Sequence, residues 1–301
     1  MFREFDYTDL GGTLYTPAIN KKIVELSNGI KFPFLKSIVF CLEDAIKNSD
    51  LKFAMQNIQF LLDNIKQTNI KVFIRPRDEK NLTEILELRG IQKIDGFALA
   101  KFGTYNMKNY FDILNHKKIK TKYHIMPVLE SKDMFDISKL KQIRELLLTQ
   151  EKHNILTLRV GGEDMFRFMN LKKSCKDSIH DFHISSKIFA DIFSVFKPYS
   201  FNITAPVYNC LENEDIFKAE VLRDIKEGFF GKTIIHPNQA LIINQLYKVS
   251  QGQYDEAKAI LDKTNEAIFR FKDKMCEPSA HSVWAETILK LEKIYGMNDT
   301  I

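Results

Sequence analysis

Two short apolar segments of the chain each end in carboxylates. Residues 123–129 are followed directly by Glu130, and residues 155–160 are followed, after a Gly-Gly turn, by Glu163 and Asp164. A helix-like segment separates them, and strand–helix–strand order is typical of a parallel βαβ unit. The acids are therefore expected at one edge of a sheet, where close carboxylates repel unless a cation or shared proton lies between them. Because Mg²⁺ takes one or two protein carboxylates and fills its shell with water and substrate oxygens, the pattern predicts a Mg²⁺ site.

Charged side chains also follow most of the other apolar runs. In chain order they are Glu43 and Asp44, Arg75 and Arg77, Lys101, and His236. A single acid at such a place is more often a helix cap or part of an ion pair. The parallel strands of a barrel, however, bring all their carboxyl ends to one face, where barrel enzymes keep their active sites. The set as a whole therefore indicates a functional site on that face.

A repeating strand-and-helix pattern must position these side chains. The expected strands are 13–16, 37–42, 71–74, 96–100, 123–129, 155–160, 200–204 and 232–235. Segments of helical periodicity alternate with them, at 20–27, 49–68, 82–88, 105–114, 133–150, 182–196, 215–227 and 239–249. Eight such units predict an α/β fold of the (β/α)8 TIM-barrel class, which typically takes about 250 residues.

The chain of 301 residues is longer than such a barrel requires. Two further helical segments, 256–275 and 282–295, predict a C-terminal helical extension. The expected division is a barrel domain over 1–250 and an extension over 251–301 that packs on the barrel or on a neighbouring subunit. The less regular segment 166–178 is expected to cover one end of the barrel.

Composition and charge exclude several classes of protein. The net charge of +5 comes from 44 basic and 39 acidic residues that are scattered along the chain, without the basic face of a nucleic-acid-binding protein. No apolar run reaches the ~18 residues of a membrane span, and the N-terminus lacks the apolar region of a signal peptide. The four widely spaced cysteines, Cys41, Cys175, Cys210 and Cys276, do not have the spacing of zinc ligands and favour a reducing compartment. We therefore expect a cytoplasmic soluble protein with no nucleic-acid or membrane partner.

The residue types at the strand ends favour the making or breaking of a carbon–carbon bond next to a carbonyl. Such a reaction passes through an enolate, whose charge a divalent cation chelated by an α-keto acid stabilises. Arginine suits the substrate carboxylate because its guanidinium makes bidentate contacts, and Arg75 is the first choice, with Arg77 second. Asp44 could order Arg75 or accept a proton from a metal-bound water.

Six motifs that occur in the expected order carry a family resemblance. They are Leu42-Glu-Asp-Ala-Ile46, Ile74-Arg75, Ala100-Lys101, Leu129-Glu-Ser131, Gly161-Gly-Glu-Asp-Met165 and Gly228-Phe-Phe-Gly-Lys-Thr-Ile-Ile-His-Pro-Asn-Gln239. With these motifs the chain resembles the HpcH/HpaI aldolase and citrate lyase β-subunit-like superfamily, which includes malyl-CoA lyases. The resemblance covers roughly residues 14–288 and implies a Mg²⁺-dependent (β/α)8 lyase, commonly a homotrimer.

The resemblance also implies roles for individual residues. The two metal ligands of the family correspond to Glu130 and Asp164, with Glu163 in place of Asp164 only if the Gly-Gly turn is aligned differently. The further assignments are catalytic roles for Glu43, Asp44, Arg75, Lys101 and Glu277, and substrate binding by Arg75, Arg77, Gly162, Glu163 and Pro206.

Three departures from the family pattern bear on the substrate. Glu277, in Met275-Cys-Glu-Pro278, stands where the CoA lyases carry an aspartate that reaches a neighbouring subunit's site. The start of the first strand, residues 12–18, lacks the family's usual arginine and glycine, so binding of CoA is left open. The ending over 277–284 is closer to a divergent branch found in bacterial stress or tellurite-resistance gene clusters. The expected function is a Mg²⁺-dependent lyase or aldolase acting on a small keto or hydroxy acid or its thioester; the alternatives are an acyl-CoA thioesterase and a non-catalytic barrel subunit.

Overall fold

The computed structural model describes residues 2–66, 68–262, 264 and 266–298. The chain divides into two compact units, Met1–Ala240 and Leu241–Ile301. The division at residue 250 that the sequence indicates, with its barrel domain and extension, stays a prediction. Among the described residues, no helix is both long and apolar enough to cross a membrane.

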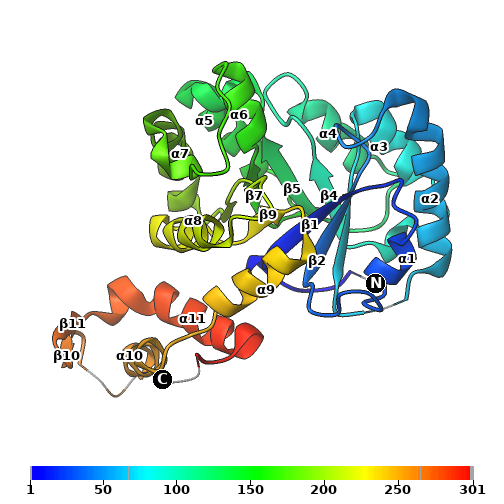
Figure 1. The fold of residues 1–301 in the computed structure, drawn as a ribbon. Helices are drawn as coiled ribbons and strands as arrows, with labels where there is room; N and C mark the ends of the chain where they lie inside the picture. Colours follow the sequence, from blue (N-terminus) through cyan, green and yellow to red (C-terminus); the bar gives the residue numbers. More distant parts are fainter. Residues whose placement is uncertain (1, 67, 263, 265, 299–301) are drawn as a thin grey trace. The chain divides into compact units, whose positions relative to one another are not determined.

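The first unit is a parallel β-barrel with helices around it (Figure 1). Within the described residues, eight parallel strands are hydrogen-bonded in the order β8-β7-β5-β4-β3-β2-β1-β9. A parallel bridge between Ala205 and Lys232 joins the end of β8 to β9 and nearly closes the ring. The predicted (β/α)8 barrel is therefore confirmed. The strands are β1 (Gly12–Pro17), β2 (Ser37–Cys41), β3 (Lys71–Arg75), β4 (Gly96–Leu99), β5 (His124–Leu129), β6 (Asn154–Ile155), β7 (Leu158–Val160), β8 (Ile203–Thr204) and β9 (Lys232–Ile234).

The helices of the first unit bury one apolar stripe each against the strands. In α2, for example, the buried positions are Ala54, Ile58, Leu61 and Leu62, which is helical spacing. The helices are α1 (Ile23–Ser27), α2 (Leu51–Asn64), α3 (Glu79–Leu86), α4 (Met107–Leu114), α5 (Ile137–Leu148), α6 (Gly162–Phe168), α7 (His183–Phe196), α8 (Glu214–Glu227) and α9 (Pro237–Leu246), of which α9 continues into the second unit. Short 3-10 helices lie at Tyr7–Asp9, Asn48–Asp50, Ile91–Lys93, Lys132–Phe135, Ile179–Asp181 and Lys197–Tyr199.

The predicted strand over 155–160 is divided by a bulge. Ile125 of β5 pairs with Ile155, and Val128 pairs with Arg159, so the second strand carries one extra residue between these two pairs. The extra residue lets both Leu156 and Arg159 point into the barrel. Leu156 joins an interior cluster with Leu10, Val39, Phe73, Ala98, Met126 and Val128.

The second unit consists of α10 (Gln251–Leu261), a hairpin of β10 (Phe269–Phe271) and β11 (Lys274–Cys276), and α11 (Pro278–Tyr295). The predicted helix over 256–275 is wrong, because α10 ends at Leu261 and the hairpin follows. Phe269 and Phe271 alternate along β10 and pack on a core formed by α10 and α11. Lys272 adopts a left-handed backbone conformation with φ 54° in the turn. The alternation of Phe269 and Phe271 with Arg270 favours a strand, because it places both rings on the same side of the chain. Packing of these partly buried rings on the core stabilises the hairpin more than the helical pattern of the region would stabilise a helix.

A buried ionic cluster lies between β9 and the surrounding helices. Lys232 is 1% exposed, and its Nζ lies 2.9 Å from Glu220 Oε1 and 2.7 Å from Asp224 Oδ2. Asp224 also accepts from His180 Nε2 at 2.7 Å, and Glu220 accepts from Ser178 Oγ at 3.0 Å. The cluster therefore ties α8 to β9 and to the segment that precedes α7.

We expect Lys232→Met to lower the free energy of unfolding by about 3–5 kcal/mol, because it leaves Glu220 and Asp224 buried without their cation. Lys187→Met is the control, since Lys187 forms an exposed pair with Asp191 and its loss is expected to change the stability by less than about 1 kcal/mol. Urea unfolding followed by circular dichroism measures both variants. Equal effects of the two substitutions would contradict a structural role for the cluster.

Candidate functional site

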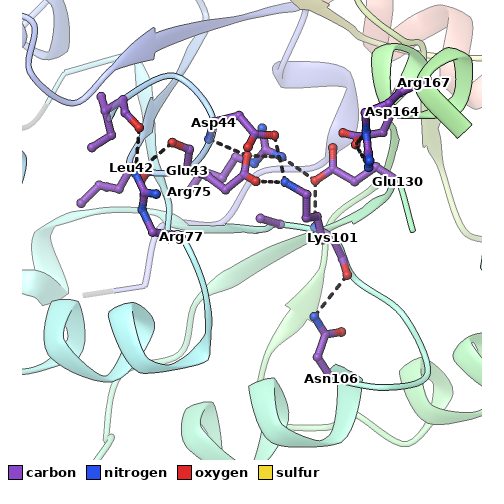
Figure 2. A network of polar contacts seen from close by, with 12 residues as sticks. Leu42, Glu43, Asp44, Arg75, Arg77, Lys101, Asn106, Glu130, Asp164 and Arg167 are labelled. Atoms are coloured by element: carbon purple, nitrogen blue, oxygen red, sulfur yellow. Dashed lines mark hydrogen bonds and ion pairs between the residues drawn. The ribbon is translucent and has the colours of Figure 1, made fainter. Parts of the chain in front are cut away.

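The carboxyl ends of neighbouring strands bring four charged side chains together (Figure 2). Arg75 is the last residue of β3, and Glu43, Lys101 and Glu130 follow β2, β4 and β5. Arg75 Nη2 lies 3.0 Å from Glu43 Oε2 and also contacts Glu130 Oε1. Lys101 Nζ contacts Glu43 Oε1. The strand-end residues that the sequence singled out thus form one connected network at one face of the barrel.

Arg75 and Lys101 both stay protonated in this network. Burial lowers the pKa of Arg75, but the neighbouring negative charges, of which that of Glu130 has the largest effect, outweigh it and raise the pKa well above its ordinary value. Burial likewise lowers the pKa of Lys101, and its hydrogen bonds to Glu43 and Asp44 more than reverse that effect. Both residues are therefore fixed positive charges at neutral pH.

Lys101 has a left-handed backbone conformation, with φ 48°. Its amide N–H donates to Glu130 Oε1 at 2.8 Å, and its carbonyl oxygen accepts from Tyr105 Oη at 2.6 Å and Asn106 Nδ2 at 3.1 Å. A left-handed non-glycine residue is energetically unfavourable and persists where surrounding contacts hold it. Here that conformation aims one backbone donor at the Glu130 carboxylate.

Asp164 lies close enough to Glu130 to affect the ionisation of Glu130. Glu130 is 4% exposed, and burial raises its pKa. The Arg75 charge lowers the pKa of Glu130, whereas the negative charge of Asp164 raises it. Gly161 makes room for this arrangement, since a Cβ at that position would lie 2.3 Å from Glu130 Cβ.

The two carboxylates fit the ligand set that Mg²⁺ takes from proteins. Among the described residues, the hydrogen bonds of Glu130 engage Oε1 and those of Asp164 engage Oδ1. Oε2 and Oδ2 are therefore the oxygens that could hold a cation. The described residues contain no group of three or more His, Cys, Asp or Glu side chains that could hold a metal, so water and substrate oxygens would complete the shell.

Neighbouring acids have different partners. Asp164 Oδ1 accepts from Arg167 Nη2 at 2.6 Å, and Glu163 Oε1 accepts from Asn209 Nδ2 at 2.9 Å. Asp44 is two-thirds exposed, and its Oδ2 lies 2.9 Å from Lys101 Nζ. Burial raises the pKa of Asp44, but the hydrogen bond from Lys101 and the charge of Lys101 contribute to leaving that pKa below its ordinary value. Asp44 is therefore an ionised and accessible acid at the rim of the network.

Arg77 lies apart from the carboxylate network. Its guanidinium donates to the backbone carbonyl of Leu42 at 3.1 Å (Figure 2). It also donates to the backbone carbonyl of Ile46 at 2.8 Å. These bonds hold the loop that carries Glu43 and Asp44. The geometry gives Arg77 a loop-holding function, and its assignment to substrate binding stays a prediction.

The remaining predicted site residues occupy different environments. Gly162 begins α6, and a Cβ there would lie 2.9 Å from Pro206 Cβ, so these two residues form a close contact in the wall beside Asp164. His236 is exposed, and its Nδ1 accepts from the Asn238 amide N–H. Glu277 belongs to the second unit, where it precedes α11 and accepts from Ser279 Oγ. Its catalytic role stays a prediction.

Arg159 was not identified as a site residue from the sequence. It is 1% exposed in the barrel interior, and its guanidinium donates to Thr13 Oγ1 at 3.2 Å and Thr233 Oγ1 at 2.8 Å. The Arg159 Cζ atom also lies 5.2 Å from the centroid of the Tyr15 ring. The sequence feature that could have identified it is its position as the one charged residue within the apolar run 155–160. Arg159 places a positive charge beneath the carboxylates of the rim.

A cavity of about 680 Å³ opens beside Asp164. Its lining residues come from the strand ends, from α6 and from the segment after α6, and they are Asp44, Lys101, Glu163, Asp164, Phe166, Arg167, Leu171, Lys172 and Lys173. The sequence indicated that the segment 166–178 covers an end of the barrel. In the structure, residues 166 and 171–173 form part of this cavity wall.

A disulfide between Cys175 and Cys210 joins the segment after α6 to the segment after β8, with a Cα–Cα distance of 5.6 Å. The cysteine spacing did not predict this pair, and it is at odds with the expected reducing compartment, where such bonds are rare. Cys41 and Cys276 are free and buried. The disulfide therefore fastens the segment that contributes Leu171–Lys173 to the cavity wall to the segment that follows β8.

We expect reduction of this disulfide to lower the free energy of unfolding by roughly 3–4 kcal/mol, because the bond closes a loop of sequence separation 35. Thermal unfolding of the wild type with and without dithiothreitol measures the effect. The double variant Cys175→Ser/Cys210→Ser is the control and is expected to be insensitive to the reductant. A wild type that is equally insensitive would show that the two thiols are not paired.

Comparisons with known proteins agree with this architecture. The model of a family described as C–C bond lyase of the TIM-barrel fold matches residues 4–297. No curated protein matches the chain. Among solved structures, the Mycobacterium tuberculosis protein CitE in complex with magnesium, acetoacetate and coenzyme A is similar with a TM-score of 0.68 and 14% identity, over 95% of this chain and 99% of that one.

Two other solved structures share the fold. A citrate lyase from Burkholderia xenovorans has a TM-score of 0.72 and 13% identity, over 97% of this chain and 94% of that one. The Haloferax volcanii malate synthase in its magnesium and glyoxylate complex has a TM-score of 0.63 and 13% identity, over 80% of this chain and 75% of that one.

Proposed function

Because the chain belongs to the C–C bond lyase family of the TIM-barrel fold, we propose that it is a Mg²⁺-dependent lyase or aldolase acting on a small keto or hydroxy acid. The observation that carries this proposal is the buried carboxylate of Glu130 beside Asp164, with the Arg75 guanidinium on the same network. The magnesium bound in the CitE and malate synthase structures, with their acetoacetate and glyoxylate, is in accord with it.

Glu130 and Asp164 would hold the cation, which would stabilise the negative charge that develops on an enolate oxygen. Arg75 would bind the substrate carboxylate through its planar fork. Glu43 supports that role, because its Oε2 lies 3.0 Å from Arg75 Nη2 and orients the guanidinium. The ordering of Arg75 by Glu43, rather than by Asp44, is the arrangement that the contacts favour.

Lys101 and Asp44 are suited to opposite tasks in proton transfer. The raised pKa of Lys101 keeps its ammonium group charged, so it would stabilise developing negative charge and would not act as a base. Asp44, with its lowered pKa and accessible carboxylate, stays ionised and could accept a proton from water at the rim.

Product analysis tests this proposal. The purified protein is incubated with Mg²⁺ and a panel of hydroxy acids and their CoA thioesters, and carbonyl products are followed by NMR alongside free thiol. Carbonyl product that requires Mg²⁺ supports the lyase, thiol without carbonyl product supports the thioesterase alternative, and the absence of both together with no Mg²⁺-dependent binding of oxaloacetate supports a non-catalytic barrel.

The resemblance to the CoA lyases supports further parts of the proposal. They are a homotrimer, a CoA thioester as one form of the substrate, and a proton-transfer role for Glu277 in its own or a neighbouring subunit. Sedimentation velocity would test the trimer. A Glu277→Gln variant would test the proton transfer, since a loss confined to kcat is expected if the residue acts in the chemical step.

A further inference from the structure

Lys173 is a buried lysine in the wall of the cavity beside Asp164. It is 6% exposed and lies in the segment after α6. Its Nζ donates to the Asp177 carbonyl oxygen at 3.1 Å and lies 4.1 Å from the Tyr208 ring centroid. No step of the proposed reaction uses this residue.

The charge of Lys173 has no carboxylate partner in the described part of the chain. No Asp or Glu oxygen there lies within 4.0 Å of Nζ, and one hydrogen-bond acceptor is supplied for the three N–H donors of an ammonium group. Burial lowers its pKa, and the more distant charges of Glu220, Glu163 and Asp177, which raise it, do not offset that effect. Burying a charge without a counterion is unfavourable, so an anion that reaches Lys173 would relieve an existing cost.

Contacts on several sides hold the segment that carries Lys173 in place. The Cys175 carbonyl oxygen accepts from Tyr208 Oη at 2.9 Å and from Asn213 Nδ2 at 2.7 Å. The disulfide from Cys175 to Cys210 fastens the same residue covalently. The ring of Tyr208, which is fully buried, supports the Lys173 ammonium group. Lys173 is therefore positioned before any ligand binds.

The other cavity residues extend this positive region. Lys172 is exposed and lines the cavity next to Lys173, and Arg167, whose guanidinium donates to Asp164, lines it as well. The cavity volume of about 680 Å³ lies in the range of sites for drug-sized ligands and exceeds what a three- or four-carbon acid requires. The space beyond Asp164 is thus larger than binding of a small keto acid alone would need, and its lining carries four basic side chains against the three acids Asp44, Glu163 and Asp164.

We propose that Lys173, with Lys172 beside it, binds a second anionic group of the substrate, a phosphate or a carboxylate, at the end remote from the keto-acid group. The inference rests on the proposed function, because the reacting end is taken to lie at Glu130, Asp164 and Arg75. It assigns the substrate to the class of acids that carry two separated anionic groups.

Isothermal titration without metal tests the second site directly, with inorganic phosphate and succinate as probes. One or both are expected to bind the wild type, and Lys173→Met is expected to weaken that binding at least about tenfold, the loss of one hydrogen bond to a charged group. Lys173→Arg keeps the charge and is expected to retain binding. Lys176→Met is the control, because Lys176 is an exposed lysine of the same segment.

Thermal unfolding separates ligand binding from a structural role of Lys173. Removing a buried, unpaired charge while keeping an apolar stem over Tyr208 is expected to leave the Tm of Lys173→Met equal to or above that of the wild type. A marked fall in Tm together with unchanged probe binding would overturn the proposal, as would the failure of both probes to bind the wild type.

The preferred probe distinguishes the two sources of negative charge. Tighter binding of phosphate indicates a phosphorylated substrate, and tighter binding of succinate indicates a dicarboxylic one. Mg²⁺-dependent binding of oxaloacetate, measured separately, reports on the reacting end. Oxaloacetate binding without probe binding would refute the second site alone, whereas probe binding without oxaloacetate binding would refute the proposed function and leave an anion site.

Discussion

Glu130→Gln is expected to abolish Mg²⁺-dependent turnover, with a fall in kcat/KM of at least about 10³-fold. The amide keeps the size of the side chain and can still accept from the Lys101 amide N–H. It removes the negative charge that would hold the cation, and a bound cation contributes several kcal/mol to stabilisation of the enolate. Asp164→Asn is expected to have an effect of similar size. Steady-state kinetics across a Mg²⁺ titration measures both variants.

Glu163→Gln is the matched control for the metal site. Glu163 precedes Asp164 in α6, but its Oε1 accepts from Asn209 Nδ2. We therefore expect Glu163→Gln to retain the Mg²⁺ dependence of the wild type. If Glu163→Gln lost Mg²⁺ binding while Asp164→Asn kept it, the second ligand would be Glu163 and the alignment of the Gly-Gly turn would have to change.

Arg75→Lys is expected to lower kcat/KM for the keto or hydroxy acid by about 10²–10³-fold. Lysine keeps a positive charge near Glu43 and Glu130, but it cannot offer a planar pair of donors to a carboxylate. Two charge-assisted hydrogen bonds, each contributing about 1.5–3 kcal/mol, correspond to a loss of about 10²–10⁴-fold, and the charge that lysine keeps offsets part of it. The free energy of unfolding is expected to change by about 1 kcal/mol or less, because the charge balance of the network is kept.

Arg77→Lys provides the comparison for that variant. Arg77 donates to the carbonyl oxygens of Leu42 and Ile46, so its replacement is expected to affect loop stability more than substrate affinity. A larger rise in KM for Arg77→Lys than for Arg75→Lys would reverse the assignment of the substrate arginine. The two variants change residues two positions apart at the end of β3 and share the same chemical change.

The barrel could be predicted from the sequence because its strands are buried on both faces. All residues of β2 and β5 are buried, and unbroken apolar runs of this kind are easy to recognise. The positions of Glu43, Arg75, Lys101 and Glu130 directly after such runs were sufficient to place them on one face. The end of a strand can be recognised from local sequence, and the parallel barrel then places the carboxyl ends of all its strands on the same face.

Features that depend on tertiary contacts were not accessible in the same way. The hairpin over Phe269–Cys276 was mistaken for a helix, because packing of the two partly buried phenylalanine rings on the core of the second unit decides the structure of that segment. The disulfide joins residues that only the fold brings together. The buried charge of Lys173 likewise follows from the packing of Tyr208, and nothing in the spacing of Lys172 and Lys173 distinguishes the buried lysine from the exposed one.

The different partners of Arg75 and Arg77 show the limit of reading a site from residue types. Both arginines follow the same strand, and both are chemically suited to a substrate carboxylate. Strand geometry directs Arg75 to Glu43 and Glu130, whereas Arg77 turns to the backbone of the preceding loop. The sequence could rank the two residues, but only the contacts separate them.

A crystal structure of the protein with Mg²⁺ and oxaloacetate tests the central claim most directly. The account predicts a cation coordinated by Glu130 and Asp164, with one carboxylate of the keto acid on Arg75 and the rest of the shell supplied by water and ligand oxygens. Both ligands are supplied at saturating concentrations. A cation bound elsewhere would contradict the account, and so would a keto acid that occupies the site without contacting Arg75 or a metal.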